Sequence, residues 1–148
     1  MERVIVGERR NWREEAEALG FAFHTIDDEP YWDESAYYRF SLPQIETDLE
    51  APTLELHEMS LDIVTRAMRD EEYLRRLALP EKFWDLIRKS YERGDPHLYG
   101  RLDLAYDGKG PAKLLELNYD TPTSLYESGY YQWIWLESRI ADGTLPHD

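Results

Sequence analysis

The sequence contains no cysteine among its 148 residues. Disulfide bonds, catalysis by a thiolate and cysteine-ligated zinc are therefore excluded. The N-terminus has no long apolar run, because its only continuous one covers residues 4–6. Such a run is far too short for the core of a signal peptide or for a membrane-spanning helix. We therefore expect a protein of the cytoplasm.

Positive charge is scarce, since 17 lysines and arginines face 31 aspartates and glutamates, which gives a net charge of −14. Nucleic acid and anionic membrane surfaces are poor partners for such a chain, because binding them needs clustered basic residues. The excess of acid suits a cationic partner, such as a polyamine or a divalent metal, or simply keeps the protein soluble. Hydrophobic residues make up 42% of the chain, enough for the core of one domain.

Apolar spacing and breaker residues predict an α+β chain whose N-terminal half is mainly helical. Gly20 and Gly94 are expected to end helices, and Pro43 suits the first turn of one. His57 is expected to be a packing or surface residue rather than a ligand, since the spacing His-Glu-x-x-His is absent. The expected elements are a helix over residues 10–19, a strand over 21–26, helices from Ser35, from Pro43 and from 52–53, and two short helices separated by Pro80.

Residues 124–140, SLYESGYYQWIWLESRI, are apolar and aromatic on nearly every side of the helix that they predict. A helix of this kind needs burial on most faces, although it is too short in apolar residues to span a membrane. We expect the chain to be the N-terminal part of a longer domain whose missing part covers this helix. A partner chain or the upstream helices could supply the cover instead.

The stretch from Tyr99 to Glu127 predicts a β-hairpin, with strands near residues 101–106 and 113–118 around the turn sequence DGKG. A hairpin centred on residues 109–110 places Asp103 opposite Glu116 and Arg101 opposite Asn118. Because side chains alternate along a strand, these four lie on one face. A one-residue bulge in the loop would move Glu116 to the other face and remove the argument.

Two directly opposed carboxylates destabilise a sheet unless something compensates for their charge. A divalent cation such as Mg²⁺ would do so, because it takes oxygen ligands from one or two carboxylates, an amide and substrate phosphates. Asp103, Glu116 and Asn118 offer such ligands, and the planar guanidinium of Arg101 could hold a phosphate or carboxylate beside them. The alternative is a solvated face on which Arg101 bridges the two carboxylates.

A helix N-terminus is predicted just after the second strand, either at Thr121 with Pro122 or at Ser124 with Glu127 in capping-box spacing. Helix N-termini bind anions through their free N–H groups. Thr121, Thr123 and Ser124 could therefore bind a substrate carboxylate, or they could only cap the helix.

The motifs YGRLDLAYDG, AKLLELNYDTPTSLYE and QWIWLE, preceded by YWDESAYYRF and ELHEM, together resemble the N-terminal part of the glutathionylspermidine synthase family. The likeness covers nearly all of residues 1–148, and the separated motifs occur in the family's order. It implies part of an ATP-grasp synthetase domain. It also implies an ATP-dependent carboxylate–amine ligase, which phosphorylates a carboxylate with Mg-ATP and lets an amine attack the acyl phosphate. A glutathione-like peptide and a polyamine-like amine are the implied substrates.

The resemblance also implies roles for individual residues. Asp103, Glu116 and Asn118 would be ligands of Mg²⁺, and Arg101 would bind the cofactor and steady the transferred phosphoryl group as a catalytic residue. The peptide substrate would contact Thr121, Thr123 and Ser124. Glu127 would only start the helix or support these residues.

Two departures from the family bear on these implications. Tyr119 stands where the family commonly has a small residue, and it either alters the pocket or points to the other face. The family is also far longer, and after Lys113 this chain has only one basic residue, Arg139, and no glycine-rich phosphate loop. We therefore expect the 148 residues alone to be an inactive fragment of the ligase. The alternative is a non-catalytic module that binds a peptide, a polyamine or a divalent cation.

Overall fold

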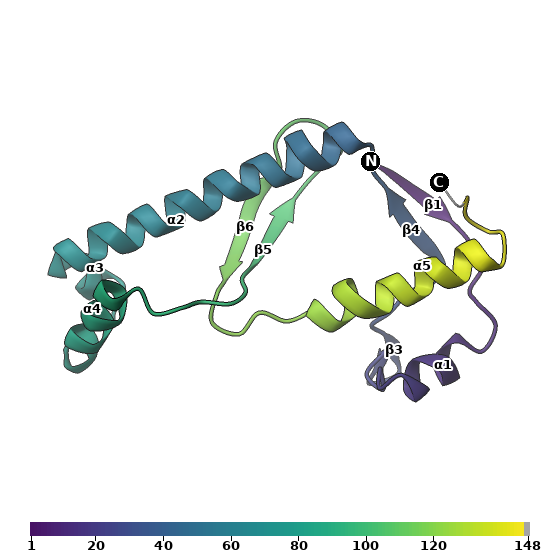
Figure 1. The fold of residues 1–148 in the computed structure, drawn as a ribbon, viewed down its shortest axis with the longest axis horizontal. Coiled ribbons are helices and arrows are strands. Elements are labelled where there is room, and N and C mark those ends of the chain that lie inside the picture. Colours follow the sequence, from purple (N-terminus) through teal and green to yellow (C-terminus); the bar gives the residue numbers. More distant parts are fainter. Residues whose placement is uncertain (147–148) are drawn as a thin grey trace. The chain divides into compact units, whose positions relative to one another are not determined.

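The computed structural model describes residues 1–146 and has the predicted α+β fold, with about half of the chain in helices. Within these residues the strands form three two-stranded antiparallel sheets. The chain divides into two compact units (Figure 1). Unit 1 comprises Met1–Ser41 and Asp120–Asp148, and unit 2 comprises Leu42–Tyr119. Each unit is described by itself below.

Unit 1 joins the two ends of the chain. Strand β1 pairs with β4, so that Glu2 lies opposite Arg39 and Ile5 opposite Ala36. The short strands β2 and β3 form a tight hairpin in which Asp27 and Asp28 adopt positive φ angles. The elements of unit 1 are β1 (Glu2–Ile5), α1 (Trp12–Ala18), β2 (Thr25–Ile26), β3 (Glu29–Pro30), β4 (Ala36–Arg39), the π-helical turn η3 (Glu127–Tyr131) and α5 (Gln132–Ala141).

The core of unit 1 is aromatic. Trp12 and Ala16 are buried four residues apart on one side of α1, and they pack with Phe21 and Tyr131. The rings of Phe21 and Tyr131 meet edge to face with centroids 4.6 Å apart, an arrangement that adds to the stabilisation from burial. Helix α1 ends before Gly20, which has a φ of 89° that favours glycine, as the sequence predicts.

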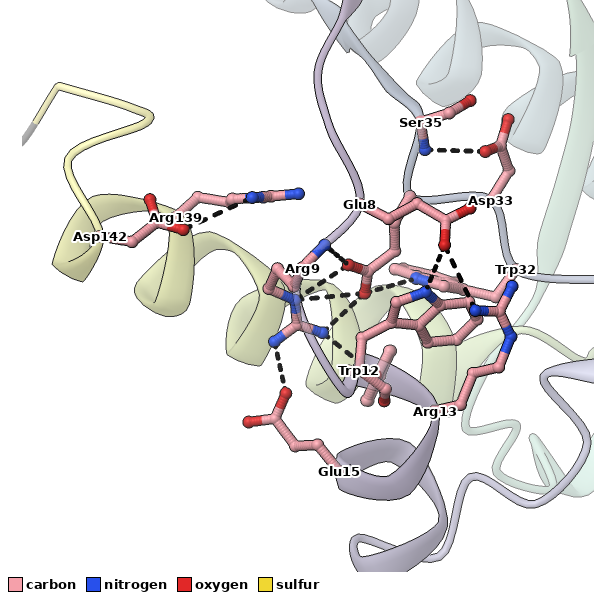
Figure 2. Close-up of polar contacts among 12 residues, drawn as sticks. Glu8, Arg9, Trp12, Arg13, Glu15, Trp32, Asp33, Ser35, Arg139 and Asp142 are labelled. Atoms are coloured by element: carbon pink, nitrogen blue, oxygen red, sulfur yellow. Dashed lines mark hydrogen bonds and ion pairs between the residues drawn. The ribbon is translucent and has the colours of Figure 1, made fainter.

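A buried ion pair lies beside this core (Figure 2). The side chain of Glu34 is fully buried, and Arg9 donates to it from Nη2 at 2.6 Å and from Nε at 3.0 Å. Arg9 also donates to the hydroxyl of Tyr131 at 3.1 Å and to the carboxylate of Glu15 at 2.6 Å. Burial lowers the pKa of the Arg9 guanidinium, but its bonds to Glu34 outweigh this and leave the pKa raised.

One predicted helix of unit 1 is wrong. Within the segment after Ser35, AYYRFSL, the residues Ala36–Arg39 form strand β4 and pair with β1. Residues 4 and 5 of β1 belong to the short apolar run near the N-terminus. Tyrosine, phenylalanine and valine favour strands when a partner is available. The partner here lies more than 30 residues away, which local spacing cannot reveal. The predicted strand over residues 21–26 is also reduced to Thr25–Ile26.

Unit 2 is helical except for one hairpin. Ala67, Leu74 and Trp84 form its buried cluster, where α2, α3 and α4 meet. Two short helices on either side of Pro80 are confirmed, and Gly94 ends the second with a φ of 62°. The elements of unit 2 are the π-helical turn η1 (Gln44–Glu50), α2 (Ala51–Arg69), α3 (Glu71–Arg76), the 3-10 turn η2 (Glu81–Phe83), α4 (Trp84–Arg93), β5 (Arg101–Ala105) and β6 (Lys113–Asn118).

The two helices predicted from Pro43 and from residues 52–53 form a single run, η1 followed directly by α2. Pro52 lies inside this run. Because Pro52 has no N–H, it cannot donate to the carbonyl of Asp48 in the α-helical pattern. The N–H of Ala112, from the loop between β5 and β6, donates to that carbonyl at 2.8 Å. The proline therefore helps to attach the hairpin to the helix.

The aromatic segment near the C-terminus is helical as predicted, from Leu125 through η3 and α5. Its burial follows one stripe, Tyr131, Trp135 and Arg139, at the four-residue spacing of a helix face. Trp133 on another side is 58% exposed. No helix in residues 1–146 is long and apolar enough to cross a membrane.

Candidate functional site

The predicted pairing across the hairpin is confirmed. Strand β5 runs antiparallel to β6 with Asp103 opposite Glu116 and Arg101 opposite Asn118. Alternation along the two strands places these four side chains on one face of the hairpin. The structure therefore brings together the four residues that the sequence singles out in this hairpin.

The register nearer the turn differs from the prediction. Leu104 lies opposite Leu114, and not opposite Leu115 as a regular hairpin around residues 109–110 would require. Leu115 is the additional residue of a β-bulge and is 70% exposed. By itself, the bulge would move Glu116 to the other face of the hairpin. The loop, however, is centred on Lys109 and not between residues 109 and 110, which shifts the pairing by one residue in the opposite direction. The two shifts compensate, and Asp103 still faces Glu116.

Arg101 and Asp103 form a two-point ion pair along β5. The guanidinium donates from Nε to Oδ1 at 2.7 Å and from Nη2 to Oδ2 at 3.1 Å. These hydrogen bonds raise the pKa of Arg101 above its ordinary value, and the nearby charge of Glu116 adds to the effect. The pair is one half of the alternative in which Arg101 bridges the two carboxylates of a solvated face. Both side chains remain partly exposed, so a ligand can reach them.

The donor set fits a hard cation of the magnesium type. A carboxylate oxygen pair can accept about four hydrogen bonds or metal bonds, so Asp103 keeps acceptor capacity while Arg101 binds it. Glu116 directly opposite and the amide oxygen of Asn118 add two further oxygen ligands. No group of three or more His, Cys, Asp or Glu side chains in residues 1–146 could hold a metal. Any Mg²⁺ here would therefore complete its oxygen shell with the Asn118 amide, with water and, in the reaction, with oxygens from a substrate.

The hairpin is fastened to the helix of unit 2 at its turn (Figure 1). Gln44 donates to the carbonyl of Gly108 at 2.9 Å, and the hydroxyl of Tyr106 donates to the carboxylate of Asp48 at 2.6 Å. Burial raises the pKa of Tyr106 to about 12, and the bond to Asp48 adds to the effect. The turn is thus held by specific polar contacts that leave the acidic face uncovered.

The residues predicted to bind substrate belong to unit 1, whereas the residues predicted to bind the metal belong to unit 2. Of the two predicted helix starts, the later one is observed. The helical run begins at Leu125, and the carbonyl of Ser124 accepts the first helical N–H bond, from Ser128 at 3.0 Å. Thr121 and Thr123 precede it in a segment that is neither helix nor strand, with a bend at Thr121. The carboxylate of Glu127 accepts a bond from the hydroxyl of Tyr31 at 2.6 Å, a supporting contact within unit 1.

One contact beside the site is absent from the sequence-based prediction. The hydroxyl of Tyr119 lies 2.7 Å from Nδ1 of His57, which is on α2. Of the two alternatives for Tyr119, the structure favours the other face, since alternation turns its side chain away from Asn118 and toward the helix. The two residues are 62 positions apart, and no local signal in the sequence connects them.

Comparison with family models matches residues 3–147 to the glutathionylspermidine synthase preATP-grasp family. The chain belongs to that family. The resemblance inferred from the hairpin and its flanking motifs is thereby confirmed for nearly the whole chain. Within this preATP-grasp domain, the residues predicted to hold Mg²⁺ lie on β5 and β6, and the residues predicted to bind substrate precede the helical run to α5.

Three curated relatives show the kind of protein to which the preATP-grasp chain is similar. A protein of Haemophilus influenzae named "Putative acid–amine ligase" is 38% identical over 122 residues, which are 80% of this chain and 30% of the relative. Trypanothione synthetase of Crithidia fasciculata is 32% identical over 85 residues, 57% of this chain and 13% of the relative. The bifunctional glutathionylspermidine synthetase/amidase of Escherichia coli is 28% identical over 132 residues, 85% of this chain and 20% of the relative. The chain thus spans less than a third of each relative.

Proposed function

We propose that this chain supplies the magnesium-binding and phosphoryl-binding part of an ATP-dependent acid–amine ligase. The observation that carries the proposal is the register of the hairpin, which sets Asp103 directly opposite Glu116 with Arg101 and Asn118 beside them. A plain structural hairpin gains nothing from two opposed carboxylates. Relationship to glutathionylspermidine and trypanothione synthetases supports the reaction class.

The residues of the site would divide the work. Asp103, Glu116 and Asn118 would hold Mg²⁺, which would neutralise negative charge on the phosphates of ATP. Arg101 would leave part of its pairing with Asp103 to bind the transferred phosphoryl group, where its fixed donors match the charge that develops. Thr121, Thr123 and Ser124 would bind the acid substrate, a peptide carboxylate.

The proposed reaction has two transfers. A carboxylate oxygen of the peptide bonds to the γ-phosphorus of ATP while the bond to the β–γ bridging oxygen breaks, which releases ADP. The nitrogen of a polyamine-like amine then bonds to the acyl carbon and loses a proton. Phosphate departs with the electron pair of the former carbon–oxygen bond, and an amide remains.

A complete nucleotide site would need groups beyond these 148 residues. Arg139, the one basic residue after Lys113, is 4% exposed. It donates to the carbonyl of Gly7 and to the carboxylate of Asp142, so its charge serves the fold of unit 1. We expect the 148-residue chain alone to show no Mg-dependent hydrolysis of ATP. Clear hydrolysis by the purified chain would contradict this division of the site.

The experiment is a comparison of two Asp→Asn substitutions in a protein that carries the complete ligase domain. Asp103→Asn should abolish ATP-dependent amide formation, because it removes a charged ligand of the cation while preserving shape. Asp107→Asn is the matched control, since Asp107 lies in the turn of the same hairpin and only accepts a bond from the N–H of Lys109. Equal turnover by the Asp103→Asn and unmodified proteins would remove the proposal.

A binding module without catalysis is the second candidate. The burial of Arg139 and the scarcity of basic residues after Lys113 favour it for the 148 residues taken alone. Its acidic hairpin would take a divalent cation, a polyamine or a basic peptide. Titration of the chain with Mg²⁺ and with spermine separates the two cationic ligands, and amide formation by the complete ligase domain separates this candidate from the first.

A further inference from the structure

The ring of Tyr119 occupies the space next to Gly100, at the open end of the hairpin. A Cβ atom added to Gly100 would lie 2.4 Å from Cε1 and 2.5 Å from Cδ1 of the Tyr119 ring. These separations are far below van der Waals contact, so any side chain at position 100 would displace the ring. An aromatic ring that covers a glycine on the neighbouring strand is a known way to fix the register of two strands.

The same ring is fastened to the helix. Its hydroxyl lies 2.7 Å from Nδ1 of His57 on α2, a hydrogen-bond distance. Its ring centroid is 5.8 Å from that of His57. Tyr119, the residue after β6, therefore contacts both α2 and Gly100, the residue before β5.

The contact between Tyr119 and Gly100 lies next to two residues of the acidic face. Gly100 directly precedes Arg101, and Tyr119 directly follows Asn118, and Arg101 and Asn118 are paired across the strands. Displacement of the Tyr119 ring would therefore remove a packing contact directly beside both of these residues. The bonds of Gln44 and Asp48 lie at the turn of the hairpin, so the Tyr119 contact joins the opposite end of the hairpin to the helix.

We propose that Tyr119 is a positioning residue for the cation site, and that it acts by packing on Gly100 and bonding to His57. The inference rests on the proposed function, because it concerns the placement of Asn118 and Arg101. A site of this kind needs its ligands held within about 0.5 Å, which supporting contacts must provide. Tyr119 touches neither the cation nor the substrate in this account.

The test measures the affinity of the purified protein for Mn²⁺ by electron paramagnetic resonance, with Mn²⁺ as the probe for the Mg²⁺ site. Gly100→Ala and Tyr119→Ala should each weaken binding about five- to ten-fold, because each removes the same packing contact. The double variant should bind no more weakly than Tyr119→Ala alone, since the smaller residue makes room for the new Cβ. Such non-additivity is the signature of one shared contact.

Tyr106→Phe is the matched control, because Tyr106 also joins the hairpin to the helix by a hydroxyl, at the turn. It should lower stability without changing Mn²⁺ affinity by more than about two-fold. Tyr119→Phe, which loses only the bond to His57, should weaken binding by about two- to five-fold.

The outcomes separate the inference from the function on which it rests. Failure of the unmodified protein to bind Mn²⁺ would overturn the proposed site and the positioning role with it. Normal Mn²⁺ binding by the unmodified protein, with Gly100→Ala within two-fold of it, would overturn only the role of Tyr119. Equal losses in Tyr106→Phe and Tyr119→Phe would also overturn it, since any loosening of the hairpin would then suffice.

Discussion

Unit 1 and unit 2 are held together in different ways. Unit 1 has a core of fully buried aromatic rings, together with a buried ion pair between Arg9 and Glu34. Unit 2 buries Ala67, Leu74 and Trp84 where α2, α3 and α4 meet, whereas its hairpin depends on a few polar contacts to η1 and α2. The strands β5 and β6 have no fully buried residue.

Because of this difference, we expect substitutions in the two places to affect different properties of the protein. Substitutions in the core of unit 1 should change the free energy of unfolding, because they leave cavities or unpaired charges. Substitutions on the polar face of the hairpin should change ligand binding and leave that free energy nearly constant. A hairpin of two strands is marginal by itself, so its anchors to the helix should matter more than its own strand pairing.

The largest expected effect is in unit 1, at Glu34. Glu34→Ala should lower the free energy of unfolding by about 4 kcal/mol, because it leaves the buried guanidinium of Arg9 without its main partner. Urea denaturation followed by tryptophan fluorescence measures the loss. Glu14→Ala, on the exposed side of α1, is the control and should change stability by less than about 0.5 kcal/mol. A loss below about 1 kcal/mol in Glu34→Ala would show that the ion pair between Arg9 and Glu34 contributes little to stability.

A slightly smaller loss is expected in the buried cluster of unit 2. Leu74→Ala should cost about 3 kcal/mol, because Leu74 is fully buried between Ala67 and Trp84. The same change at Leu77, which is 58% exposed, is the matched control. Mn²⁺ affinity measured below the unfolding transition should be equal in the two variants. A weakened affinity in Leu74→Ala alone would mean that the cluster and the hairpin are not separable.

The smallest expected effect concerns the anchor at the turn and appears only at high pH. The pKa of Tyr106 is raised from an ordinary value of about 10 to about 12, so the folded state favours the neutral phenol. Its contribution to stability should be complete below pH 10 and disappear between pH 10 and pH 12. The advantage of the unmodified protein over Tyr106→Phe should therefore shrink over that range in thermal melts. A constant difference from pH 8 to pH 12 would show that the phenol is not held neutral.

The hairpin was predictable because its information is local. Two runs of alternating residues around a glycine-rich turn determine which side chains share a face. The bulge at Leu115 was not predictable, since it depends on how the loop attaches to Asp48 through Ala112 and Tyr106. The pairing of Asp103 with Glu116 survives because the loop shifts in the compensating direction.

Three of the missed features join residues that are distant along the chain. Strand β4 pairs with β1, Arg9 binds Glu34, and Tyr119 bonds to His57, at separations from 25 to 62 residues. Periodicity and propensity are properties of a short window, so they read the segment from Ser35 as a helix. Tertiary pairing overrides such preferences when a strand partner is present.

The central claim is that the face of the hairpin carrying Asp103 and Glu116 holds a divalent cation. Its most direct test is the paramagnetic broadening of backbone amide signals of the 148-residue chain by substoichiometric Mn²⁺. Signals of residues 101–103 and 116–118 should broaden first, and Asp103→Asn should abolish this preference. Broadening spread evenly over the acidic surface, and unchanged in Asp103→Asn, would contradict it.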